Sequence, residues 1–138
     1  MDDAISRYRA ATEAGDVDGF METLAPNVEV VSPISGRMVF RGQSDVRTLL
    51  SAVYGTLNGL RWTKAVGNGE SRVVVGEAHV AGIRMTDAMV FDLAPDGRIQ
   101  RISPHLRPWL ALTLFALLLG PKVARHPAMI RRALAGGS

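Results

Sequence analysis

The sequence SRVVVGEAHVAGIRMTDAMVFDL, residues 71–93, alternates between apolar and polar side chains on both sides of Gly82. A period of two with many β-branched residues is typical of half-buried strands, and a glycine between two such segments favours a tight turn. Similar alternation precedes the turn signal Asn-Gly at 68–69 and follows the turn signal Pro-Asp-Gly at 95–97. The pattern predicts an antiparallel meander of four strands at residues 60–66, 71–81, 83–93 and 98–106.

The chain before this meander has the spacing of helices. Residues 3–14 are expected to form a first helix that Gly15 ends, and Asp16 is expected to cap a second helix that stops at Pro26. The predicted buried positions are Ile5, Tyr8 and Thr12 in the first helix and Val17, Phe20, Met21 and Leu24 in the second.

A short hairpin and a third helix complete the predicted elements. Residues 28–32 are rich in β-branched side chains, and residues 38–40 form the expected return strand. The third helix is expected to begin at residues 42–45. Its predicted buried stripe consists of Val46, Leu49, Leu50, Val53 and Tyr54. Three helices, a hairpin and a meander predict an α+β fold, in which a cone-shaped, curved antiparallel sheet is wrapped by N-terminal helices around an apolar pocket.

The composition is that of an ordinary soluble globular protein. The chain has 138 residues, of which 47% are apolar and 21% charged, and it has no cysteine. Its acidic start does not resemble a secretory signal, so a cytoplasmic location is expected. Phosphate loops, dinucleotide fingerprints and zinc-protease motifs are absent from the sequence, so we expect no cofactor.

The formal net charge of +3 hides a strong asymmetry. Residues 1–96 carry nine basic and all thirteen acidic residues, a net charge of −4, whereas residues 97–138 carry seven basic residues and no acidic one. The last third is therefore expected either to dock on the acidic body or to face an anionic surface. Nucleic acid is not expected as a partner, because the basic residues are interleaved with long aliphatic stretches and few aromatics.

The segments SRYRAA, residues 6–11, and AGDVDGF, residues 14–20, are similar to the first two helices of bacterial ketosteroid isomerases. The likeness continues through VEVVSPI at 28–34 and TDAMVF at 86–91, and it covers about residues 3–106 in the order of elements. The chain thus resembles the nuclear transport factor 2-like superfamily and its SnoaL-like and ketosteroid-isomerase-like proteins. The resemblance implies a cystatin-like α+β roll with a pocket for a steroid, terpenoid or polyketide.

Carried over onto this sequence, the resemblance implies that Tyr8 is the catalytic tyrosine and Asp87 the neutral aspartic acid that donates a hydrogen bond. In ketosteroid isomerases an apolar site keeps that aspartic acid protonated. Such a pair would hold a developing oxyanion. The family's general base is an aspartate before a proline, but this chain has Ser32 before Pro33. A serine hydroxyl cannot abstract a carbon-bound proton near neutral pH, so an isomerase or cyclase reaction would need Glu77, His79 or His105 as its base.

The strand pattern by itself also directs Asp87 inward. Alternation places Asp87 on one face with Met85, Met89 and Phe91, where burial should raise the pKa of the carboxyl. Arg84 falls on the opposite face, which argues against the Asp-Arg-Asp set of limonene-epoxide-hydrolase-like relatives. The other expected ligand contacts are Phe20, Leu24, Ser32, Leu49, Trp62, Met85, Met89 and Leu106.

No metal site is expected. Glu77 and His79 share a strand face without an apparent third ligand, so a solvated outer face or a dimer contact is the favoured interpretation.

The C-terminal segment is the unusual part of the sequence. Residues 109–119 are almost continuously apolar and precede Gly120-Pro121, which is expected to end the run. Eleven residues are too few to span a bilayer, which takes about twenty. We expect a cone domain at residues 1–107 and a helical extension at residues 108–138 that covers the cone or packs against a second subunit. Contact of this basic extension with a membrane surface is the less favoured alternative.

Two functions follow from these observations. The first is a small-molecule-binding protein or enzyme that grips a carbonyl or hydroxyl oxygen of an apolar ligand through Tyr8 and Asp87, and it is expected to be a homodimer. The alternative is a non-catalytic interaction module, whose cone is filled by side chains and whose extension mediates dimerisation or membrane-surface contact. Whether the cone is hollow separates the two.

Overall fold

The computed structural model describes residues 3–32, 37–67, 69–107 and 109–135, with the backbone alone for residues 107 and 109–112. The helices are α1 (Ala4–Ala14), α2 (Val17–Met21), α3 (Gln43–Thr56), α4 (Trp109–Ala124) and α5 (Pro127–Ala135). The strands are β1 (Leu24–Val31), β2 (Val39–Arg41), β3 (Asn58–Val66), β4 (Ser71–Val80), β5 (Ile83–Leu93) and β6 (Ile99–Arg107).

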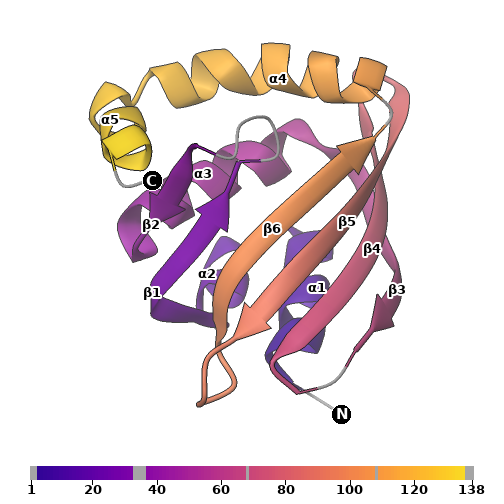
Figure 1. Cartoon of the computed structure of the whole chain (residues 1–138). Helices are drawn as coiled ribbons and strands as arrows, with labels where there is room; N and C mark the ends of the chain where they lie inside the picture. The colour runs from indigo at the N-terminus through magenta and orange to yellow at the C-terminus, as the bar shows by residue number, and fades with distance from the viewer. Residues whose placement is uncertain (1–2, 33–36, 68, 108, 136–138) are drawn as a thin grey trace.

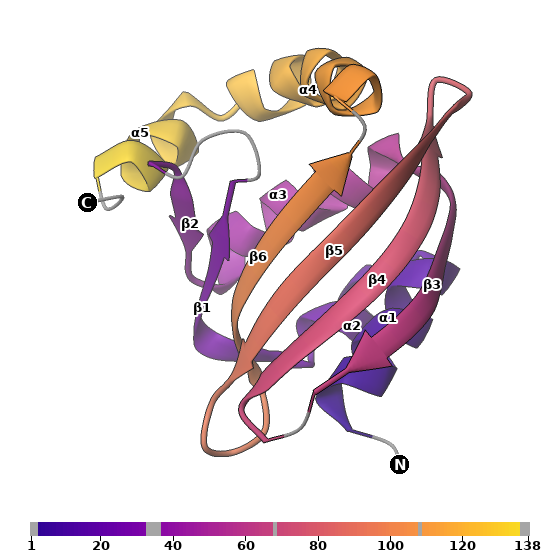
Figure 2. The same cartoon turned by 45° about the vertical axis from the view of Figure 1, so that its right-hand side comes forward.

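The strands form one sheet in the order β2-β1-β6-β5-β4-β3. Figure 1 shows the sheet with α1, α2 and α3 on one side and α4 lying across its upper end. The view in Figure 2 shows the curvature of the sheet around these helices. The predicted α+β cone and its antiparallel meander are confirmed by the register of β3, β4, β5 and β6.

One strand pairing departs from the predicted antiparallel sheet. Strand β1 pairs with β6 in parallel, with Val30 opposite Ile102, and this joins the hairpin of β1 and β2 to the meander. Alternation in a sequence identifies strands, but it does not state which distant strands pair or in which direction.

The two N-terminal helices begin and end as their capping residues predict, with one exception. The side chain of Asp16 accepts a hydrogen bond from the Gly19 backbone at 3.0 Å, and Gly15 adopts a left-handed φ of 72°. However, α2 ends at Met21, and Leu24 begins β1 opposite Ile99. Pro26 therefore lies inside a strand, in the stretch where the register of β1 with β6 shifts and a missing N–H is tolerated.

Helix α4 is longer than the sequence predicts, because it continues through Gly120 and Pro121 to Ala124. Contacts with the body of the protein hold its last turn in place. Val123 packs against both apolar clusters of the core, and the Lys122 Nζ donates a hydrogen bond to the Thr56 hydroxyl at 2.7 Å. Tertiary packing therefore overrides two residues that disfavour a helix interior.

Helix α5 brings part of the basic extension onto the acidic body. Met129 and Ala133 are buried, and the Arg132 guanidinium forms an ion pair with the Asp45 carboxylate at 2.6 Å. Arg101 likewise pairs with Glu29 and Arg98 with Asp96, so three of the seven cations pair with carboxylates of residues 1–96, in agreement with the docking interpretation.

Gly76 of β4 is required by the packing of Trp62 on β3. An added Cβ at Gly76 would lie 2.6 Å from Cε3 of Trp62, whose indole nitrogen donates a hydrogen bond to the Thr12 hydroxyl at 2.9 Å. We expect Gly76→Ala to displace the indole and to lower the free energy of unfolding by about 2 kcal/mol. Urea unfolding measures this loss. The control is Gly55→Ala, which adds a methyl group to α3 with nothing within 4 Å and should stabilise slightly. A neutral Gly76→Ala would contradict the tight packing.

Candidate functional site

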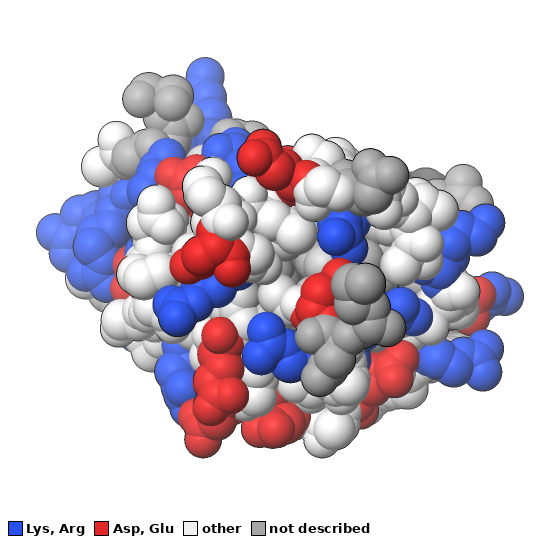
Figure 3. Space-filling view, turned by 90° about the horizontal axis from the view of Figure 1, so that it is seen from below, with Lys and Arg blue, Asp and Glu red and all other residues white. Residues whose placement is uncertain are grey.

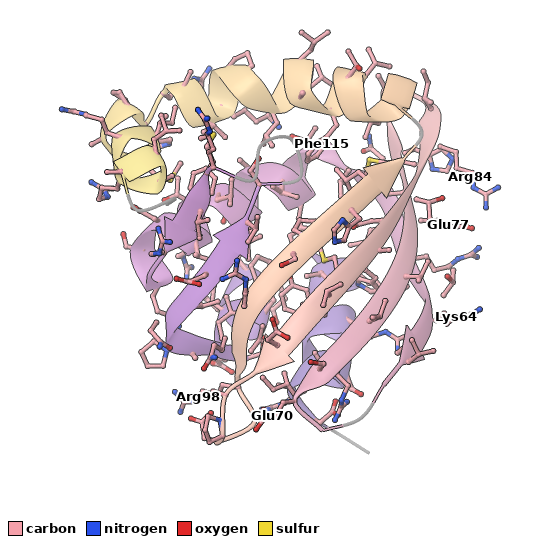
Figure 4. All side chains as sticks on the ribbon, in the orientation of Figure 1. Lys64, Glu70, Glu77, Arg84, Arg98 and Phe115 are labelled. Carbon is pink, nitrogen blue, oxygen red and sulfur yellow. The ribbon has the colours of Figure 1, made fainter. Side chains whose placement is uncertain are left out.

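A cavity of about 260 Å³ lies inside the cone beneath α4. Its wall is made by side chains of β1, β2, α3, β5 and β6, and its cover by α4 and Ile130 of α5. Figure 4 shows Phe115 of α4 beneath the helix, on the side of the sheet. The described part of the cone is therefore hollow, which argues against a cone filled by side chains.

The wall is apolar except at two residues, Asp87 and Ser32. Asp87 lies in the middle of β5, where alternation turns it inward between Met85 and Met89, and it is only 5% exposed. Its Oδ1 is buried and has no hydrogen-bond partner among the described residues. Ser32 follows β1, and its backbone N–H donates a hydrogen bond to the Met38 carbonyl at 2.9 Å. The cavity thus combines an apolar surface with one buried carboxyl.

Burial controls the ionisation of this carboxyl. Loss of solvation raises the pKa of Asp87 from its ordinary value of 3.8 to about 7, although a hydrogen bond from the backbone of His105 opposes the shift. Near neutral pH a large fraction of Asp87 is therefore protonated. In that form its O–H can donate a hydrogen bond to an oxygen placed in the cavity.

The structure separates the predicted site residues into two groups. Those that line the cavity are Ser32, Leu49, Met85, Asp87, Met89 and Leu106. Those that lie in the core and do not line it are Tyr8, Phe20, Leu24 and Trp62. The prediction that the residues of this second group contact a ligand in the pocket is therefore corrected, because their side chains are packed in the core. Helix and strand periods identify the buried side of an element, but not whether that side meets a cavity or packed side chains.

Tyr8 lies in an aromatic cluster of the core. It is fully buried, with its ring centroid 5.2 Å from that of Phe91 and 5.9 Å from that of Phe20. Its hydroxyl is 2.5 Å from the hydroxyl of Tyr54, which in turn donates to the Met89 sulfur at 4.0 Å. Tyr8 therefore reaches the cavity only through other side chains.

The tyrosine pair is nevertheless coupled to Asp87. Burial raises the pKa of both phenols, and the negative charge of ionised Asp87 raises each further. The helical spacing of the sequence predicts Tyr54 only as a member of the buried stripe of the third helix. No pattern indicated its partnership with Tyr8, because the two residues are 46 positions apart and belong to different helices.

Of the two arrangements expected for the C-terminal extension, the structure has the one in which it covers the cone. Phe115, Leu119 and Val123 line the cavity from α4. The apolar run at residues 109–119 signalled burial, but a run that is apolar on every face does not indicate which face meets the protein.

The three candidate bases lie away from the cavity wall. Glu77 forms ion pairs with Arg84 and Arg61, and Figure 4 shows Glu77 and Arg84 at the outer edge of the sheet. His79 and His105 are exposed, and neither lines the cavity. Among the described lining residues, Asp87 is the one carboxyl, and no histidine, lysine or arginine accompanies it.

Comparison with known proteins agrees with this architecture. One similar solved structure is a protein with a cystatin-like fold from Silicibacter pomeroyi, with a TM-score of 0.86 and 19% identity over 94% of this chain and 93% of that chain. Another is a steroid delta-isomerase from Pseudomonas aeruginosa, with a TM-score of 0.81 and 20% identity over 91% of this chain and 92% of that chain. A third is a putative polyketide cyclase from Sinorhizobium meliloti, with a TM-score of 0.64 and 20% identity over 76% of this chain and 95% of that chain. At these identities the likeness shows the fold. No curated protein sequence matches the chain significantly. The model of the SnoaL-like domain matches residues 5–102, more than half of the chain, which therefore belongs to the SnoaL-like family of the nuclear transport factor 2-like superfamily.

Proposed function

We propose that the protein binds a compact, largely apolar small molecule in the cavity beneath α4, and that protonated Asp87 donates a hydrogen bond to a carbonyl or hydroxyl oxygen of this ligand. The observation that carries the proposal is the Oδ1 of Asp87, which is buried in an apolar wall without a hydrogen-bond partner among the described residues. A buried polar atom without a partner costs free energy, and a ligand oxygen within reach would remove that cost.

The chemistry of the wall selects the ligand. Apolar side chains favour a hydrocarbon skeleton, and a carboxyl in this setting disfavours an anionic ligand. The volume of about 260 Å³ lies just below the range of roughly 300–1,000 Å³ that is common for small-molecule sites, so the ligand should be compact. Nuclear transport factor 2-like proteins generally bind small molecules, and the names of two structural neighbours refer to steroid and polyketide chemistry. A terpenoid, steroid or small polyketide fits this class.

Binding is favoured over proton-transfer catalysis. An isomerase-like reaction needs one group that donates a hydrogen bond and a second that removes a proton. Asp87 cannot hold its proton and accept another at the same moment. The other polar residue of the lining is Ser32, whose hydroxyl cannot abstract a carbon-bound proton near neutral pH. In this proposal Tyr8 and Tyr54 belong to the packed core and do not touch the ligand, and homodimerisation stays a prediction.

The proposal is tested by calorimetric titration with 2-naphthol and with β-ionone, a compact phenol and a compact enone, at about pH 6. We expect saturable binding to the wild-type protein. Replacing Asp87 by leucine should weaken it about tenfold, because one hydrogen bond of about 1.4 kcal/mol is lost. Binding to the wild type should also weaken at about pH 8.5, where Asp87 has lost its proton.

The matched control is Asp92→Leu, which removes a carboxylate on the outer face of the same strand, where Ser71 donates to it at 3.3 Å. This variant should bind as the wild type does. Absence of binding by the wild type, or equal binding by Asp87→Leu, would reject the proposed site and favour the interaction module.

A further inference from the structure

The outer face of α4 is an apolar surface that the described part of the chain leaves uncovered. All eight residues from Leu114 to Pro121 are apolar. The inner face buries Phe115 and Leu119, whereas Leu117 is 66% and Leu118 is 45% exposed. Figures 1 and 2 both show α4 at the edge of the molecule with no other element on its far side.

Such exposure is uncommon elsewhere in the described residues. The exposed large apolar side chains are Leu117 and Leu118 of α4, Leu134 of α5 and Val66 of β3. Three of these four belong to the two C-terminal helices. A helix that is apolar on every side is normally covered on every side, so the outer face of α4 requires an explanation.

The charged residues of the C-terminal segment that carries this face have one sign. Arg125 directly follows Ala124, the last residue of α4, and Arg131 lies in α5. Arg125 and Arg131 are exposed and take part in none of the ion pairs of the described residues. No acidic residue occurs between 97 and 138. By contrast, the end of the molecule away from α4 carries acidic and basic side chains interspersed, as Figure 3 shows.

These charges distinguish between two possible partners of the outer face of α4, a second copy of the chain and an anionic bilayer. A second copy of the chain, packed through the same face, would bring arginines together without a carboxylate from either extension to pair them, and like charges at an interface are unfavourable. A bilayer with anionic headgroups would accept the leucines in its interfacial region and pair the arginines with phosphates. Within the described residues, no helix is long and apolar enough to cross a membrane, so α4 would lie in the plane of the surface.

We propose that α4 and the adjoining arginines dock on the surface of an anionic lipid bilayer, with Leu117 and Leu118 inserted among the headgroups. The proposal does not depend on the ligand of the cavity. If both hold, the cover of the cavity lies at the surface of the bilayer in which apolar ligands dissolve.

Flotation of the full chain with vesicles tests this proposal. The vesicles are phosphatidylcholine alone, or phosphatidylcholine with about 30% phosphatidylglycerol, at low ionic strength. We expect binding to the anionic vesicles and little to the neutral ones. The double variant Leu117→Gln/Leu118→Gln should weaken binding at least about tenfold, and Arg125→Gln/Arg131→Gln should weaken it about tenfold or more.

Two single-site controls make the same kinds of change elsewhere, the loss of an exposed apolar side chain and the loss of an exposed arginine. Val66→Gln polarises an apolar side chain that is 51% exposed at the end of β3, and Arg98→Gln removes an exposed arginine that Figure 4 shows at the end away from α4. Both should bind as the wild type does. Because the replaced side chains are exposed, all variants should keep the wild-type melting temperature.

Three results would overturn the proposal. The first is no binding of the wild-type protein to anionic vesicles. The second is equal loss in the controls, which would indicate unspecific adsorption. The third is a dimer in sedimentation velocity that Leu117→Gln/Leu118→Gln dissociates while vesicle binding is absent, which would assign the face to a second copy.

Discussion

When the pH rises from about 4 to about 8, the free energy of unfolding of the wild-type protein is expected to fall by about 4 kcal/mol relative to that of an Asp87→Asn variant. In the unfolded chain Asp87 has a pKa near its ordinary value of 3.8, whereas in the folded protein burial raises the pKa to about 7. Between these values the folded state holds a proton that the unfolded state has released. The stabilising effect is therefore complete below pH 3.8 and is lost as the pH rises to about 7, at about 1.4 kcal/mol per pH unit.

Urea unfolding at several pH values measures this difference. The amide side chain of the Asp87→Asn variant is neutral at every pH, so subtracting the variant's curve from that of the wild type isolates the ionisation of this one carboxyl. Asp96→Asn, which removes a carboxylate from the exposed turn before β6, is the control for the loss of one charge. Parallel curves for the wild type and Asp87→Asn would mean that water solvates Asp87 in the folded state, and the proposed hydrogen-bond donor would be lost with it.

Replacement of Phe115 by alanine is expected to cost about 3–5 kcal/mol. Phe115 is 2% exposed and packs with Val80, Met85 and Leu119 in the cluster that joins α4 to the sheet. It also lines the existing cavity, so truncation would enlarge that cavity with no side chain available to fill the space. Fewer contacts would then hold α4 over the cone, and its amide hydrogens should exchange faster with solvent.

Leu117→Ala on the same helix is the matched control. Leu117 is 66% exposed, and its truncation should change the free energy of unfolding by no more than about 0.5 kcal/mol. Urea unfolding and hydrogen exchange of the α4 amides measure both variants. Equal effects of the two truncations would show that α4 is not held by its inner face, and the cavity would then lack a stable cover.

Local patterns in the sequence determined most of the fold. The alternation in residues 83–93 predicted β5 with its correct bounds and turned Asp87 inward with Met85 and Met89. Gly15 and Asp16 marked the boundary between α1 and α2. These predictions succeeded because period and capping depend on residues that are close in the sequence.

The candidate site was predictable only in part, because a pocket depends on contacts between distant segments. Asp87, Ser32 and the apolar wall of β5 followed from strand alternation and the resemblance. The position of Tyr8 in the packed core, and its contact with Tyr54, did not follow, since each tyrosine shows only that one side of its helix is buried.

By itself, the sequence determined an α+β cone with an inward-facing aspartate and a basic, apolar C-terminal extension. The tertiary structure decided that the cone is hollow, that β1 pairs in parallel with β6, and that α4 covers the cavity and continues through Gly120 and Pro121. Each of these outcomes depends on which buried surfaces meet. The periodicity of a sequence indicates which side chains are buried. Which residues a buried side chain contacts depends on how distant segments of the chain pack together.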